Sequence, residues 1–178
     1  MSTKRFFNGP DNDDRARAIL HCTISNDVEG PLYIITSTTR RDSGYWTKLL
    51  DELGWEGCYQ VDSWYNLGKY KDVDSSTFIF DGDKVYHKAK WTASFLKIAK
   101  SNKWYAAAGY NDSWLDHMWL FIACGFYKNK TEFQREHIAF RKHAYYPIVD
   151  CYTNVNRLRD NLNKIVVLPP YTRGRTDE

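Results

Sequence analysis

Short runs of apolar residues alternate along this chain with longer segments in which apolar positions recur every three or four residues. The short runs are residues 31–36, 58–61, 78–80, 104–108 and 164–168, and the longer segments are residues 46–53 and 91–100. Uninterrupted apolar runs are typical of strands that are covered on both faces, as in parallel sheets. Segments with helical periodicity are typical of amphipathic helices. The pattern predicts an α/β fold, a three-layer sandwich on a mainly parallel sheet, with residues 78–80 in its central strand.

Local signals add detail to this outline. Gly54 is expected to end the helix at residues 46–53. Ser113, with Asp116 three residues further on, predicts a capping box at the start of another helix. Because no repeat or linker divides the chain, residues 1–170 are predicted to form one domain, followed by a polar, flexible tail at residues 171–178.

The composition is ordinary for a globular domain and changes the picture little. The 178 residues carry 25 Lys and Arg against 22 Asp and Glu, a net charge of +3, which permits an acidic partner without requiring one. Neither a signal peptide nor an apolar run long enough to span a membrane is present, so we expect a cytoplasmic protein without a membrane partner. The four cysteines form no CxxC pair and are expected to be reduced and mostly buried.

One stretch has the spacing of a phosphate-binding loop but lacks its chemistry. In the loop G-x-x-x-x-G-K-[ST], backbone amides cradle the phosphates, the Lys reaches them, and the hydroxyl binds Mg²⁺. Counting from Gly9, the places of the second Gly, the Lys and the Ser/Thr are taken by Asp14, Arg15 and Ala16. A carboxylate therefore stands where a phosphate would approach, and Mg²⁺ loses its hydroxyl ligand.

A second altered motif lies at residues 77–84. Its apolar run ends in Asp81, at the place of the metal-holding Asp of such ATPases, and Gly82 stands where a helicase carries Glu. Two altered motifs in the right order and at a plausible separation indicate a nucleotide-binding frame whose chemistry has been removed.

Further segments match one protein family in order along the chain: residues 34–42, 61–70, 78–81, 91–100 and 125–137. Over most of its length the chain resembles the first RecA-like lobe of phage-encoded superfamily 2 (SNF2-like) DNA helicases. The resemblance implies a RecA-like, P-loop NTPase-like sheet with a single-stranded DNA contact at Arg40 and Arg41. Of the family's chemical groups only Asp81 remains, and the Ser-Ala-Thr stretch appears as Ala107-Ala108-Gly109. The second lobe, which closes on ATP, does not fit in this length.

The altered motifs argue against catalysis. Phosphoryl transfer depends on positioned charge and Mg²⁺, so we expect a pseudo-ATPase that works without a cofactor. Arg15 could still pair with a phosphate, but Asp11, Asp13 and Asp14 surround it and repel a triphosphate. Alternatively, these aspartates begin a helix, because acidic residues stabilise the first turn. The His and Cys residues lack metal-ligand spacing, so no metal site is expected.

Basic residues interleaved with aromatic ones offer a possible contact with DNA or RNA. Such interleaving recurs at residues 69–71, 88–91, 127–130 and 141–146. It suits phosphate pairing together with base stacking, although solvated basic faces over an aromatic core give the same pattern. Arg40 and Arg41, together with Lys128 and Lys130, are the residues that we expect to carry a retained nucleic-acid contact.

Function is expected to lie in binding. The leading hypothesis is an inhibitor of a host defence or nucleic-acid machine, for example an anti-CRISPR protein, whose partner is a host effector protein in the cytoplasm of the host cell. The alternatives are a nucleic-acid-binding accessory factor in phage replication or recombination, and one lobe of a split helicase or ATPase. The face that once closed over nucleotide is the predicted docking face, and it would present Asp11, Asp13, Asp83, Tyr110 and Trp114.

Overall fold

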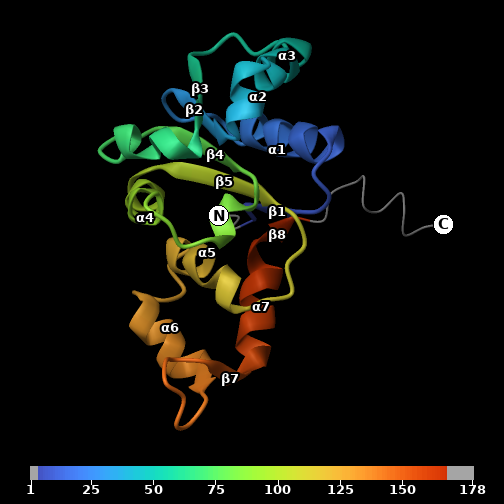
Figure 1. Cartoon of the computed structure of the whole chain (residues 1–178). Coiled ribbons are helices and arrows are strands. Elements are labelled where there is room, and N and C mark those ends of the chain that lie inside the picture. Colours follow the sequence, from blue (N-terminus) through green and yellow to red (C-terminus); the bar gives the residue numbers. More distant parts are fainter. Residues whose placement is uncertain (1–3, 168–178) are drawn as a thin grey trace, which may run out of the picture.

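A parallel sheet runs through the middle of the molecule (Figure 1). The computed structural model describes residues 4–167 of the chain, and within them this sheet has six strands. The strands are β1 (Phe6–Asn8), β2 (Leu32–Thr36), β3 (Tyr59–Ser63), β4 (Thr77–Asp81), β5 (Lys103–Ala108) and β8 (Val166–Val167). Their order is β3-β2-β4-β5-β1-β8, and every neighbouring pair is parallel. All of β4 is buried between β2 and β5, which confirms its predicted central place.

Helices cover both faces of this sheet (Figure 1). One face carries α1 (Asp13–Ser25), α2 (Thr38–Asp42) and α3 (Tyr45–Glu52). The other carries α4 (Thr92–Ser101) and α5 (Met118–Ala123) with the 3-10 helices η1 (Trp64–Tyr70), η2 (Asp83–Tyr86) and η3 (Leu115–His117). The predicted fold class is confirmed: the chain is an α/β three-layer sandwich on a parallel sheet, an arrangement consistent with a RecA-like lobe.

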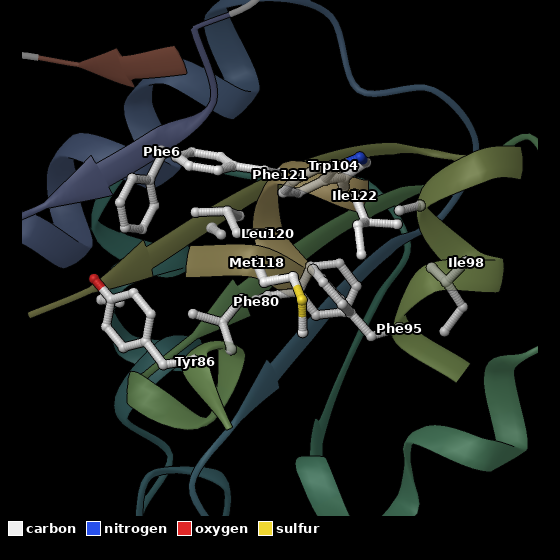
Figure 2. Packing of buried hydrophobic residues seen from close by; sticks show 14 of the residues in the cluster. Phe6, Phe80, Tyr86, Phe95, Ile98, Trp104, Met118, Leu120, Phe121 and Ile122 are labelled. Atoms are coloured by element: carbon white, nitrogen blue, oxygen red, sulfur yellow. The ribbon is translucent and has the colours of Figure 1, made fainter. Parts of the chain in front are cut away.

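The two faces bury separate hydrophobic cores. Successive residues of a strand point to opposite faces, so Phe7 packs with Ile19 and Trp46 of α1 and α3, whereas Phe6 belongs to the core on the other side. Figure 2 shows part of this second core, labelled at Phe6, Phe80, Tyr86, Phe95, Ile98, Trp104, Met118, Leu120, Phe121 and Ile122. Because apolar area is buried on both sides, the strands read as uninterrupted apolar runs in the sequence.

Most predicted elements lie within two residues of their predicted bounds. This holds for β2, β3, β5, α3 and α4. Gly54 follows α3 with a φ of 71°, the left-handed conformation in which glycine commonly ends helices. The predicted strand at residues 164–168 is shorter than expected, because Lys164 and Ile165 belong to the preceding helix and only Val166–Val167 pairs with β1. Residue 168 and the predicted tail at residues 171–178 lie outside the described residues.

The predicted capping box at Ser113 is wrong. The backbone amide of Ser113 donates to Oδ1 of Asn111 at 2.7 Å, and Nδ2 of Asn111 donates to Oδ2 of Asp116 at 3.0 Å. The short side chain of Asn111 thus closes a local turn, and η3 begins at Leu115 without a side-chain cap. The expectation of mostly buried thiols is also wrong: Cys58 and Cys151 are exposed, and Cys22 and Cys124 are only partly buried.

A small unit follows α5 and projects away from the sandwich (Figure 1). It consists of α6 (Lys130–His137), β6 (Ile138–Phe140), β7 (Val149–Tyr152) and α7 (Val155–Ile165). β6 and β7 form an antiparallel pair, and α7 returns the chain to the sheet at β8. The apolar pattern did not predict the β6–β7 hairpin, because its strands are short and largely unburied.

Candidate functional site

The loop between β1 and α1 is the stretch that has the spacing of a phosphate loop. The Gly9 amide donates to the carbonyl of Ala108 at 3.0 Å, which ties the loop to β5. Asn12 is the N-cap of α1, since its Oδ1 accepts from the Arg15 amide at 3.0 Å. Asp13 and Asp14 lie in the first helical turn, as the capping interpretation of these aspartates predicts.

The Arg15 side chain turns inward at the start of α1. Only 1% of Arg15 is exposed, and its guanidinium donates to the Gly9 carbonyl at 3.0 Å. The same guanidinium lies 3.1 Å from Oδ1 of Asp11 and 3.3 Å from Oδ1 of Asp81. The cation at the lysine position of the loop is therefore held by the protein's own carbonyl and carboxylates. Ala16, the next residue, is buried in the core on the α1 side.

Asp81, at the carboxyl end of β4, has donors on both carboxylate oxygens. Besides Arg15 on Oδ1, its Oδ2 accepts from the Thr36 hydroxyl at 2.7 Å and from Arg40 at 3.0 Å. The Asp81 carbonyl accepts from Trp64 Nε1 at 2.9 Å, and Trp46 Nε1 donates to the Thr36 hydroxyl oxygen at 3.1 Å. A metal ion at this carboxylate would have to lie beside the positive charges of Arg15 and Arg40.

Gly82 lets the chain turn sharply after Asp81. Its φ of 114° lies in a region that favours glycine, and its amide donates to the Ala107 carbonyl at 2.8 Å. Glycine is therefore the residue that this backbone conformation favours at position 82.

Arg40 closes the network from α2. Its guanidinium lies 2.8 Å from Oδ1 of Asp11 and 3.0 Å from Oδ2 of Asp81, and it stacks 4.3 Å above the ring of Tyr45. Partial burial acts to lower the pKa of Arg40, but the attraction of Asp81 and Asp11 outweighs it and raises that pKa. Two arginines and two aspartates therefore form one neutral cluster, here called the Arg15–Asp81 network.

Arg41 is also engaged in ion pairs. Its guanidinium lies 2.9 Å from Asp42 and 3.4 Å from Asp62. Burial of Asp62 acts to raise its pKa, but hydrogen bonds from Tyr70, Asn66 and the Ser63 amide outweigh burial and lower that pKa. Both arginines that were expected to contact nucleic acid are thus paired with carboxylates in the protein itself.

The strand order explains why these residues meet. Ile35, Phe80, Ala106 and Phe6 lie opposite one another on β2, β4, β5 and β1, so the carboxyl ends of the four strands reach the same edge. Helices after β1 and β2 cover one face and those after β3, β4 and β5 the other, so the winding reverses between β5 and β1. Ligands of open α/β sheets bind in the crevice at such a switch point.

A cleft of about 780 Å³ opens at this edge. Arg15, Asp81 and Trp64 line it, together with Asp83 and Trp91. Lys84 and Lys88 add positive charge around it. Three members of the Arg15–Asp81 network, Asp11, Arg15 and Asp81, therefore line this cleft.

The other predicted site residues are dispersed. Lys128 and Lys130 are exposed at the start of α6, in the small unit, far from α2 (Figure 1). Asp13 accepts from the Tyr45 hydroxyl at 2.7 Å, and Asp83 accepts from the Gly109 amide at 2.8 Å. Tyr110 is exposed.

Trp114, by contrast, packs against the rings of His117 and Phe121. The sequence did not single out three residues that hydrogen-bond at the network: Thr36 donates to the Asp81 carboxylate, Trp46 donates to Thr36, and Trp64 donates to the Asp81 carbonyl. The one available signal was that Thr36 ends a predicted strand, as Asp81 does.

Within residues 4–167, no group of three His, Cys, Asp or Glu side chains is placed to hold a metal ion, and no helix is both long and apolar enough to cross a membrane. No protein-family model matches the chain, and no curated protein is similar to it in sequence.

Proposed function

We propose that this chain is a catalytically silent, helicase-like lobe of phage origin that acts by binding in the cytoplasm of the host cell. Its target in this proposal is a host effector protein of a defence or nucleic-acid machine, such as a CRISPR effector, which it inhibits. The observation that carries the proposal is the buried Arg15 guanidinium, paired with Asp81 at the place where phosphate and Mg²⁺ would meet.

The chemistry of the network disfavours nucleotide. Mg²⁺ requires oxygen ligands in near-octahedral geometry, and both Asp81 oxygens already accept from Arg15, Thr36 or Arg40. A triphosphate would have to compete with Asp11 and Asp81 for the two guanidinium groups. Without bound phosphate and metal, phosphoryl transfer has no electrostatic stabilisation.

A retained surface supports a role in binding. At the carboxyl edge of the sheet, Asp13, Asp83 and Tyr110 are exposed, and neither aspartate has an ion-pair partner among the described residues. Asp11 is exposed too, but it is paired with Arg15 and Arg40. Carboxylates beside an aromatic ring suit a basic partner surface, such as a nucleic-acid channel, because complementary charge speeds encounter and the ring supplies contact area. We therefore place the docking face there, at a smaller set of residues than the sequence suggested.

The first test concerns nucleotide. Calorimetric titration with ATP and Mg²⁺, and a turnover assay with and without DNA, should show neither binding nor hydrolysis by the purified protein. Turnover that Asp81→Ala abolishes would mean that the lobe is an enzyme and would overturn the proposal.

The second test concerns the partner. The protein should capture a nucleic-acid-processing complex from host lysate and reduce that complex's activity on its substrate. The triple variant Asp13→Asn, Asp83→Asn, Tyr110→Ala should lose both effects. The matched control Asp51→Asn, Glu56→Gln removes exposed carboxylates near α3 and should retain them. If the triple variant inhibits as strongly as the unaltered protein, this docking face is excluded. If the unaltered protein itself does not inhibit, the inhibitor function is excluded.

A further inference from the structure

Positive charge is concentrated in the small unit that projects from the sandwich. Residues 126–165, here called the basic unit, carry eight Lys and Arg against four Asp and Glu, a net charge of +4. Residues 1–125 carry fifteen Lys and Arg against sixteen Asp and Glu, a net charge of −1. The small overall charge of the chain therefore conceals two parts of opposite sign, and the net charge of the basic unit favours polyanions.

The β6–β7 hairpin ends in an exposed tip at residues 140–147. The tip lies at the end of the basic unit that is farthest from the sheet (Figure 1). Tyr145 is fully exposed, Tyr146 is 65% exposed and Phe140 is 42% exposed. Seven large hydrophobic side chains are exposed among residues 4–167, and three of them lie on this one tip. Aromatic rings concentrated in solvent are unusual in a monomeric protein and indicate a contact surface.

The cations of the tip differ from those of α2. Arg141 and Lys142 are exposed, and neither has a carboxylate partner within the described residues. Arg40 and Arg41, by contrast, are each held by carboxylates. An unpaired cation can neutralise a phosphate without first breaking an ion pair, so the tip suits phosphate better than α2 does.

The base of the hairpin is fixed. His137 donates from Nδ1 to the Thr153 carbonyl at 2.9 Å, and the Thr153 amide donates to the His137 carbonyl at 2.8 Å. The Tyr127 hydroxyl donates to Nε2 of the same imidazole and accepts from the Asn161 amide at 2.9 Å. His137, Tyr127 and Asn161 are buried. The tip is therefore carried on an anchored support that joins α6, β7 and α7.

We propose that the hairpin tip binds single-stranded nucleic acid, with Tyr145 and Tyr146 stacking on bases and Arg141 and Lys142 pairing with phosphates. Aromatic rings next to cations are the combination by which proteins hold single strands without sequence preference. Unpaired bases present the faces that the rings need, whereas a duplex hides them.

The test is fluorescence anisotropy with a labelled oligothymidylate of about 12 nucleotides, within the usual range of single-strand sites. Tyr145→Ala, Tyr146→Ala should weaken binding by about tenfold or more, as expected when a stacked base loses its ring. Arg141→Ala, Lys142→Ala should reduce the slope of log K against log salt by about 1.4, the value for two phosphate contacts on a single strand. Because these side chains are exposed, the melting temperature of both variants should stay unchanged.

Matched controls lie on the sandwich. Tyr59→Ala, Tyr65→Ala removes two exposed rings, and Lys48→Ala, Lys100→Ala removes two exposed charges. Both should leave affinity for the oligonucleotide unchanged. Affinity retained by the tip variants, or lost equally in the controls, would overturn the proposal.

Two further probes identify the kind of partner. The same oligonucleotide as a duplex should bind more weakly, and equal affinity would exclude stacking. Polyglutamate should compete poorly, and full competition would assign the tip to acidic protein surfaces instead. These measurements need no host partner, so a failure here is distinct from a failure of the inhibitor function.

Discussion

The Arg15–Asp81 network should make Asp81→Asn strongly destabilising. The substitution removes one charge and leaves Arg15, which is 1% exposed, with the Gly9 carbonyl and a single carboxylate, Asp11, whose side chain is 64% exposed. Removing one partner of a buried ion pair costs about 3–5 kcal/mol. Because Asp11 and Gly9 remain as partners, we expect the lower end, about 3 kcal/mol. For a chain of this size that corresponds to a decrease of about 6–12 °C in melting temperature.

Urea denaturation followed by tryptophan fluorescence measures this loss, with scanning calorimetry as a second method. The midpoint should fall while the slope of free energy against urea stays constant. In a double-mutant cycle, Arg15→Met should cost less in the Asp81→Asn background than alone, with a coupling of at least about 1 kcal/mol. The control Asp72→Asn breaks an exposed pair with Lys97 and should leave the melting temperature unchanged. This prediction would be refuted if Asp81→Asn lowered the melting temperature no more than the control does, or if the free-energy costs of Arg15→Met and Asp81→Asn were additive.

Two further predictions concern backbone fit and pH. Gly30→Ala should destabilise the protein by more than Gly44→Ala, although both glycines have a left-handed φ. A Cβ at position 30 would lie 2.4 Å from the Ser75 carbonyl oxygen, whereas a Cβ at position 44 would meet no atom within 4 Å. Equal melting temperatures of the two variants would contradict this. Burial lowers the pKa of His117 below its ordinary 6.5, so as the pH falls the imidazole is protonated in the unfolded chain before it is protonated in the folded one. The free energy of unfolding should therefore decrease as the pH falls below 6.5. Melting temperatures between about pH 5 and pH 8 should show a smaller decrease for His117→Phe, and an identical decrease would contradict this.

The sequence alone predicted the layers of the fold. The strand Thr77–Asp81 has three consecutive apolar residues instead of an alternation of apolar and polar ones, because both of its faces are buried. This local property identifies a central parallel strand. The same holds for Leu32–Thr36, and the helical period of Thr92–Ser101 marks a helix with one buried face. β1, with three residues, is too short to give such a pattern, and its place is set by pairing with β5 and β8.

The sequence also singled out Arg15 and Asp81 as altered positions, but it did not predict that they bind each other. They are 66 residues apart, and Thr36 and Arg40 reach the same carboxylate from a third strand and its following helix. Spacing along the chain carries no information on this encounter. It results from the strand order β2-β4-β5-β1, which brings the carboxyl ends of the strands to one edge of the sheet. At that edge the carboxylates of Asp11 and Asp81 neutralise the buried Arg15 guanidinium, whose burial without a partner would cost several kcal/mol.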